Sequence, residues 1–136
     1  MKVVLDANVL VSAVIAEGAS HSLVSRWLDR GALEVVMCPA LLAEVEDVLG
    51  RPRIQKRVKP ELAGLYLATI QRLAELVPDP KSISSHTRDP NDDYLVALAR
   101  EHGADYIVTG DKDLLEWPEQ RPLVITPAAF AELVGE

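Results

Sequence analysis

Short apolar runs alternate with stretches of helical periodicity along the chain, and this alternation restricts the possible folds more than any other feature of the sequence. Strands that are joined by helices pair in parallel and are covered by helices on both faces. We therefore predict an α/β fold of three layers (α/β/α), with a parallel sheet of four to five strands. The expected strands are residues 3–5, 34–37, 76–77, 106–109 and 123–125.

Turn-forming residues support the boundaries of several helices. Gly31 and Gly103 follow helical stretches, and glycine commonly occupies the position just after a helix. Thr126 and Pro127 have the pattern of an N-cap followed by proline at the first helical position. The expected helices are residues 8–16, 20–30, 39–49, 52–58, 60–75, 91–102, 111–116 and 127–134.

Length and composition exclude several classes of protein. A chain of 136 residues suits one domain, which we expect to span residues 1–136. The single cysteine, Cys38, excludes an internal disulfide framework and a cysteine-cluster zinc site. No apolar run reaches the roughly 18 residues of a membrane helix. The net charge of −7 argues against nucleic-acid binding through overall positive charge, and it leaves open a local basic patch or a bound cation.

The first sixteen residues superficially resemble a signal peptide, with one positive charge followed by an apolar stretch. Asp6 and Asn8 interrupt that stretch, which a signal peptide tolerates badly. We expect a buried strand over residues 2–5 that leads into a helix, and a cytoplasmic protein in which Cys38 is reduced.

Two aspartates follow expected strands. Asp6 comes directly after the run MKVVL, and Asp111 follows YIVT and one glycine. Ligands of parallel α/β sheets bind at the carboxyl ends of the strands, so both side chains lie where a site would form. Helix capping is an ordinary structural role for both residues. Capping does not exclude metal binding, because a cap in a crevice can also face an ion.

Glu44 lies at the edge of the apolar face of the helix expected over residues 39–49. A carboxylate on such a border costs free energy unless it is paired or bound, although it can also extend into solvent. The apolar face consists of Leu41, Val45 and Val48.

Asp92 lies at the centre of the buried face expected for the helix over residues 91–102. Asp93 shares the helical phase of Ala97 and Arg100 and is expected at the surface, and it is also a candidate to support the site. Asp89, just before a proline, is expected as a cap or turn residue, or as support for the site. The buried neighbours of Asp92 at helical spacing are Leu95, Val96 and Ala99.

Carboxylates that converge in one crevice repel one another, by about 4 kcal/mol for a pair at ~4 Å and an effective dielectric constant of 20. Such a group stays ionised only with a cation. An all-oxygen cluster without histidine or cysteine favours Mg²⁺ or Mn²⁺ over Zn²⁺. These ions activate water and neutralise charge on a phosphodiester.

Four motifs, in this order along nearly the whole chain, resemble the PIN-domain family, in particular the VapC-like ribonucleases that form the toxin component of prokaryotic toxin–antitoxin pairs. The motifs are VVLDANVLVSA, PALLAEVEDVLGRPRI, RDPNDDYLVALAREHGADYIVTGDKDLL and VITPAAFAEL. The resemblance implies a metal-dependent endoribonuclease with a PIN-like fold. It also implies that the ligands of one or two Mg²⁺ or Mn²⁺ ions are Asp6, Glu44, Asp92 and Asp111.

The same resemblance assigns supporting positions around this site. Asn8 and Thr109 match polar positions of the family's supporting shell, and Asp113 matches an acid that often accompanies Asp111. The chain has Ala7 where the family often has threonine, so one hydroxyl near the metal is missing, and Pro39 where it often has serine. A site of this kind needs no histidine, so structural or surface roles are expected for His21, His86 and His102.

Residues 51–59 form a basic stretch without an acidic residue. They directly follow the helix that carries Glu44, so they could contact RNA phosphates and lead the substrate toward the metal. A solvated helix face explains the pattern equally well. The basic residues are Arg51, Arg53, Lys56, Arg57 and Lys59.

The family resemblance further implies a homodimer and a cognate antitoxin that plugs the site. Two expected helices, 20–30 and 60–75, carry many apolar residues. Most should be core, and any that remain exposed would form an interface. They are Leu23, Val24, Trp27, Leu28, Leu62, Leu65, Tyr66, Leu67, Ile70 and Leu73.

Three alternatives remain at this point. A haloacid-dehalogenase-like phosphatase shares an aspartate after the first strand, but Asn8 replaces its second acid and no catalytic lysine is evident. A receiver-type signalling domain needs a lysine after the fifth strand, where this chain has VITP. A PIN-like module could bind RNA or protein without cleaving, although four acids at the expected positions argue against this.

Overall fold

A computed structural model of the protein describes the chain except for residues 31–32, 82–89, 119, 121 and 136. Residues 30, 90–92 and 135 are described by their backbone alone. Five strands form one sheet in the order β3-β2-β1-β4-β5, and each pair of neighbours is parallel. The strands are β1 (Lys2–Leu5), β2 (Glu34–Met37), β3 (Glu75–Leu76), β4 (Tyr106–Val108) and β5 (Leu123–Ile125).

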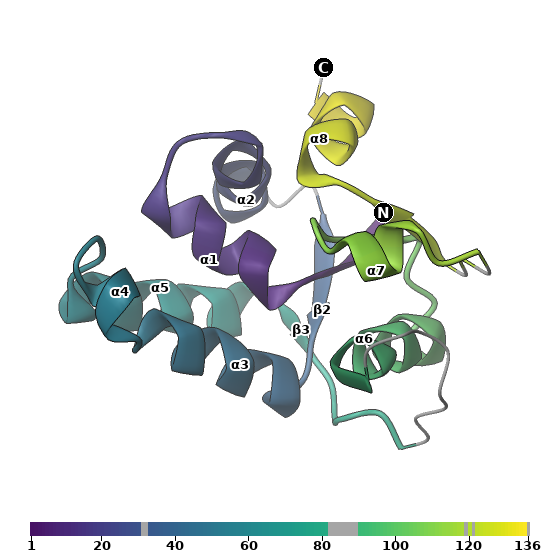
Figure 1. Ribbon diagram of the computed structural model, residues 1–136, viewed down its shortest axis with the longest axis horizontal. Helices are drawn as coiled ribbons and strands as arrows, with labels where there is room; N and C mark the ends of the chain where they lie inside the picture. Colours follow the sequence, from purple (N-terminus) through teal and green to yellow (C-terminus); the bar gives the residue numbers. More distant parts are fainter. Residues whose placement is uncertain (31–32, 82–89, 119, 121, 136) are drawn as a thin grey trace.

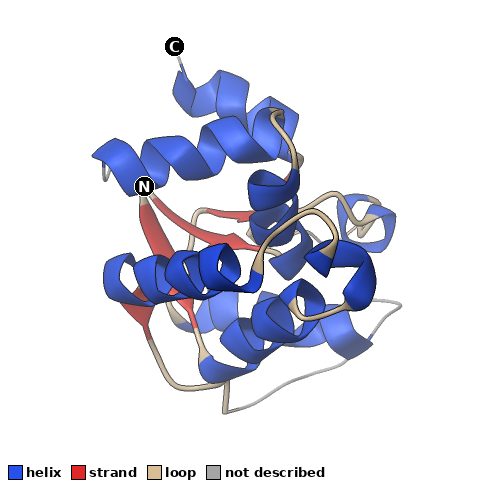
Figure 2. Cartoon of the chain, turned by 90° about the vertical axis from the view of Figure 1, so that its left-hand side faces the viewer, coloured by secondary structure: helices blue, strands red, loops and turns tan. Residues whose placement is uncertain are grey.

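Helices cover both faces of this sheet, so the predicted three-layer α/β/α fold is confirmed (Figures 1 and 2). On one side, α1 packs against α2 and α3, while α6 packs against β1 and β4 on the other side. The helices are α1 (Ala7–Ile15), α2 (Ala19–Arg30), α3 (Pro39–Leu49), α4 (Pro52–Gln55), α5 (Pro60–Leu73), α6 (Pro90–Glu101), α7 (Lys112–Leu115) and α8 (Pro127–Gly135).

Proline and capping residues set where these helices begin. Proline is the first residue of α3, α4, α5, α6 and α8, where its missing N–H costs no hydrogen bond. The hydroxyl of Thr126 accepts a hydrogen bond from the backbone N–H of Ala129, as expected for an N-cap. Gly103 follows α6 with a φ of +64°, a conformation that favours glycine.

Most predicted boundaries agree with the structure to within one or two residues. The helix expected over residues 52–58 is wrong at its end, because α4 stops at Gln55. After Gln55 the chain continues as a hydrogen-bonded turn, in which the backbone N–H groups of Arg57 and Val58 both donate to the carbonyl of Ile54. Ile54 and Val58 are nevertheless buried and anchor this turn on the core.

Strand β1 lies at the centre of the core, and Val3, Val4 and Leu5 are fully buried. A strand with both faces covered carries apolar side chains on both, as β1 does at every position after Lys2. None of the described helices is by itself long and apolar enough to cross a membrane. The two segments Ala7–Ile15 and Ala19–Asp29 would reach that length and apolar composition only if they were counted together, and a bend of 94° separates them.

Cys38 makes the stability of the fold depend on pH. Its side chain has no exposed surface, and burial, aided by a hydrogen bond with Asp79, raises the pKa of the thiol to about 11. The unfolded thiol ionises near its ordinary pKa of 9.0, so the buried thiol contributes stability in full below that pH. This contribution is lost as the pH rises from 9.0 to about 11.

We therefore predict that the free energy of unfolding of the parent protein falls relative to that of Cys38→Ala between pH 8 and pH 10.5. Urea denaturation of both proteins, in a reducing buffer at each pH, measures the difference. A constant difference would contradict the buried, protonated thiol.

Candidate active site

Asp6 and Asp111 lie at the carboxyl ends of two neighbouring strands. In the register of β1 and β4, Leu5 is opposite Val108, and the backbone N–H of Asp6 donates to the carbonyl of Val108 at 3.0 Å. Both aspartates are helix N-caps, so the ordinary structural role expected for them is confirmed. Asp6 Oδ1 accepts from the N–H of Asn8 at 3.2 Å, and Asp111 Oδ1 accepts from the N–H of Asp113 at 2.9 Å.

The hydroxyl of Thr109 joins these two aspartates. Its Oγ1 donates to Asp6 Oδ2 at 2.6 Å and accepts from the backbone N–H of Asp111 at 3.0 Å. Thr109 has no exposed surface, and its own N–H donates to the carbonyl of Ile125 on β5. Asp6 is only 6% exposed. One buried hydroxyl therefore fixes the Asp6 carboxylate relative to the backbone of Asp111.

Glu44 comes to the site from α3 and is half-buried. Its Oε1 accepts a hydrogen bond of 2.6 Å from the hydroxyl of Tyr94, which belongs to α6. The expected apolar face of α3 is buried, and Glu44 lies at the border of that face. The carboxylate thus has a partner inside the protein instead of extending into solvent.

The negative charge of Asp6 also affects the pKa of Tyr94. Burial first, and then the hydrogen bond and negative charge of Glu44, raise the pKa of the Tyr94 phenol far above its ordinary value, with smaller contributions from Cys38 and Asp6. The phenol therefore stays protonated near neutral pH and acts as a donor. Glu44 on α3 and Asp6, the N-cap of α1, therefore both influence the Tyr94 side chain.

Asp92 lies in the first turn of α6, and its side chain is outside the described part of the chain. Asp89 also falls outside the described residues. Asp93 is 4% exposed, so the expectation that it lies at the surface is wrong. It has an interaction partner, as buried carboxylates require.

The wrong prediction for Asp93 has a structural cause. The prediction assumed that α6 buries one face, whereas Leu95, Val96, Ala97, Leu98 and Ala99 are all buried. One side of α6 packs on β1 and β4 of the sheet. On another side, the guanidinium of Arg100 lies over the ring of Trp117, a residue that follows α7, at 5.4 Å from the ring centre. Because α6 is covered on more than one side, its helical phase does not reveal which acid is exposed.

The three proposed ligands with described side chains have neutral partners. Within the described ranges, no ion pair with lysine or arginine involves Asp6, Glu44 or Asp111. Over those same ranges, no group of three or more acidic, histidine or cysteine side chains is arranged to hold a metal ion, and Asp92 is not part of that test. The ligand atoms that these three residues could offer a metal are all carboxylate oxygens, which fit Mg²⁺ or Mn²⁺ better than zinc.

Comparison with known protein families gives one decisive result. The family model of the PIN domain matches residues 2–113. The chain belongs to the PIN domain family. A comparison with curated proteins gives no significant match.

Solved structures with the same fold include two relatives of low sequence identity. The crystal structure of PAE2754 from Pyrobaculum aerophilum has a TM-score of 0.66 and 18% identity, over 100% of this chain and 91% of that chain. The crystal structure of VapBC2 from Rickettsia felis, bound to a DNA fragment from their promoter, has a TM-score of 0.59 and 15% identity. That match covers 92% of this chain and 97% of the other.

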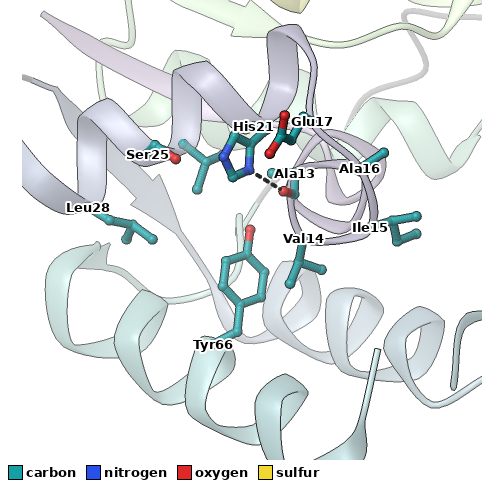
Figure 3. A pocket seen from close by; sticks show the side chains of 10 residues that line it. Ala13, Val14, Ile15, Ala16, Glu17, His21, Ser25, Leu28 and Tyr66 are labelled. Carbon is teal, nitrogen blue, oxygen red and sulfur yellow. Dashed lines mark hydrogen bonds between the residues drawn. The ribbon is translucent and has the colours of Figure 1, made fainter. Parts of the chain in front are cut away.

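The remaining residues that are expected to support the site lie near the aspartates. Asn8 is exposed, and its backbone N–H donates to Asp6. Asp113 is half-buried and donates its backbone N–H to Asp111. The Nδ1 atom of His21 lies 3.0 Å from the carbonyl oxygen of Ala13 (Figure 3), and His86 falls outside the described residues.

The basic stretch of the PIN domain is exposed along α4 and the turn that follows it. Arg51 forms an ion pair of 3.2 Å with Asp47, one turn earlier on α3, and both side chains are largely exposed. An exposed pair of this kind contributes little to stability, so it leaves Arg51 accessible to other anions. The exposed members are Arg51, Arg53, Lys56, Arg57 and Lys59.

A cavity of about 330 Å³ lies between α1, α2 and α5, and it is separate from this site (Figure 3). None of the proposed metal ligands lines it. Its wall is mainly apolar, and Tyr66 at its edge donates a hydrogen bond of 2.6 Å to the carbonyl of Leu10.

Two residues that shape the site, Tyr94 and Asp79, could not be identified from the sequence. Tyr94 escaped notice because aromatic residues in helices usually serve packing, although a buried tyrosine needs a partner for its hydroxyl. Asp79 Oδ1 accepts from the backbone N–H of Ala40 at 2.8 Å and so caps α3, for which Cys38 provides no side-chain cap. No local sequence signal links Asp79 to a helix that begins forty residues earlier.

We predict that Thr109→Val lowers the free energy of unfolding by about 1–3 kcal/mol, because it leaves a buried carboxylate oxygen and a backbone N–H without their partner. Urea denaturation measures the loss. Thr69→Val is the matched control, since that hydroxyl donates only to the carbonyl of Leu65 one turn earlier on α5. Equal losses in the two variants would contradict the linking role of Thr109.

Proposed function

We propose that the chain is a metal-dependent endoribonuclease that hydrolyses RNA phosphodiester bonds, with Asp6, Glu44, Asp92 and Asp111 as ligands of Mg²⁺ or Mn²⁺. PIN domains are generally nucleases, and such nucleases generally use divalent metals. The observation that carries the proposal is the link from Asp6 through the Thr109 hydroxyl to the backbone of Asp111. It joins residues a hundred positions apart at the strand ends where α/β sheets bind ligands.

The chain's own residues prepare this site for a cation. The caps and the Thr109 hydroxyl hold Asp6 and the backbone at Asp111 in place, and these donors are neutral, so the negative charge is kept. A bound Mg²⁺ or Mn²⁺ ion would activate water for attack on phosphorus and neutralise charge on the phosphodiester. The burial of Asp6 lowers the local dielectric constant and so strengthens attraction for a cation.

The proposed RNA contact is the basic stretch of residues 51–59. Glu44 and the C-cap residue Gly50 of α3 are six residues apart, which is about 9 Å along a helix. The stretch is exposed and begins just beyond Gly50, so phosphates bound there would lie near the proposed metal site. Its side chains would position the RNA backbone without reading its bases.

We further propose that the protein is the cytoplasmic toxin of a toxin–antitoxin pair, inhibited by a cognate antitoxin that blocks the site. The fold shared with the VapBC2 structure of Rickettsia felis supports this proposal, together with the motifs that resemble VapC-like ribonucleases.

The proposed homodimer would use the outer side of α5. Leu62, Leu65 and Leu73 are 51%, 64% and 42% exposed and lie within about 80° of one another around the helix axis. The expectation that the apolar residues of α2 are core is confirmed for Leu23, Val24 and Trp27. Exposed leucines on one side of a helix are typical of a protein interface, and a second copy would cover them.

We predict that Asp6→Asn and Asp92→Asn each abolish RNA cleavage in Mg²⁺ or Mn²⁺, because each removes a charged metal ligand. A time course on a mixed RNA substrate measures the loss. In chelator, both variants should melt at or above the temperature of the parent protein, since carboxylate repulsion is relieved and an asparagine at position 6 can still cap α1.

Asp29→Asn, which changes an exposed acid on α2, is the control and should cleave like the parent. Cleavage by the parent in excess chelator, or equal activity in all variants, would refute the proposed mechanism. RNA binding by the parent without cleavage would instead support the non-cleaving module.

We predict that the parent protein has twice the chain mass of 14.9 kDa in solution and that Leu65→Glu is monomeric, because the buried charge would cost several kcal/mol. Size-exclusion chromatography with light scattering measures the mass. Gln71→Glu adds the same charge on the opposite side of α5 and should remain dimeric. A monomeric parent would contradict the proposed interface.

A further inference from the structure

Tyr94 connects the two helices that carry Glu44 and Asp92. Its hydroxyl reaches from α6 to α3 and donates to Glu44 Oε1 at 2.6 Å, between residues fifty positions apart. In Figure 1, α3 and α6 lie on either side of β2. This hydrogen bond therefore sets the position of one proposed ligand relative to the helix that bears another.

We infer that Tyr94 is a positioning residue for Glu44: its hydroxyl occupies one carboxylate oxygen and orients the other, Oε2, toward a divalent cation. The inference rests on the proposed function, because it assumes that Glu44 is a metal ligand. It adds a role for a residue that the four motifs do not mark as functional.

The arrangement around Asp6 has the same form. Asp6 accepts a hydroxyl from Thr109 at 2.6 Å, just as Glu44 accepts one from Tyr94 at 2.6 Å. Hydroxyls orient a carboxylate without cancelling its charge, whereas a lysine or arginine partner would compete with the cation. In the described part of the chain, neither acid forms an ion pair with a basic residue.

Glutamate needs such a partner more than aspartate does. Its longer side chain has more rotatable bonds, and ordering it costs more conformational entropy. The tyrosine ring is stiff, with two rotatable bonds, and it is packed against the core. Tyr94 can therefore fix Glu44 before a cation arrives, and partners that orient metal ligands typically change metal affinity by about 10- to 100-fold.

The chain offers a matched control in Tyr66. Its hydroxyl donates to the carbonyl of Leu10 at 2.6 Å, and burial raises the pKa of its phenol above the ordinary value, as it does for Tyr94. Tyr66→Phe thus removes a hydrogen bond of the same length from a half-buried tyrosine, whose hydroxyl bonds to none of the proposed ligands. A general loss of stability should affect both variants.

The experiment uses the full chain and two readouts of metal binding besides activity. Calorimetric titration with Mn²⁺ should show about tenfold weaker binding by Tyr94→Phe and a change of less than twofold for Tyr66→Phe. The chain has three tyrosines, so labelling of the ring Cζ carbon with ¹³C gives three signals. Addition of Mg²⁺ should shift the Tyr94 signal and leave those of Tyr66 and Tyr106 in place.

The outcomes separate this inference from the proposed function. If the parent binds neither ion, both the metal site and the role of Tyr94 are wrong. If the parent binds Mg²⁺ but the Tyr94 signal does not move, or if Tyr94→Phe binds Mn²⁺ as tightly as the parent, the positioning role alone is overturned. The labelling measurement is made on the parent sequence, with signals assigned from Tyr66→Phe and Tyr106→Phe, so it stands even where Tyr94→Phe does not fold.

Discussion

The parallel pairing of β1 with β4 is the constraint on which the site depends. It brings Asp6 and Asp111, from opposite ends of the sequence, to the same edge of the sheet, and the buried hydroxyl of Thr109 then locks them together. A shift of one residue in this register would turn every side chain of the strand to the other face. The apolar residues Val3, Val4 and Leu5 of β1, which must be covered on both faces, thus indirectly hold the acids in place.

Much of the fold and part of the site could be predicted from the sequence, because both depend on local patterns. Apolar runs, prolines at helix starts and Gly103 placed the elements, and strand ends identified Asp6 and Asp111 as residues of one edge. The half-buried position of Glu44 also followed from its phase in α3.

Contacts between distant segments could not be predicted. Helical phase placed Asp93 at the surface, but α6 is covered on more than one side, and a periodicity argument cannot detect a second covering layer. The hydrogen bond from Tyr94 to Glu44 and the cap that Asp79 provides for α3 both join residues about forty or fifty positions apart. Each depends on how two elements meet, which no single stretch of sequence encodes.

Asp6 and Asp111 are both helix caps and proposed metal ligands, so the proposed chemistry depends directly on the fold. Each uses one oxygen to start a helix, so its orientation is established during folding, before any ligand is present. Replacement by alanine would damage both the helix start and the proposed binding site. An inactive alanine variant would therefore not show which of the two was lost. Asparagine keeps one acceptor oxygen for the helix start and removes the charge together with the second acceptor oxygen, so it separates folding from chemistry better than alanine does.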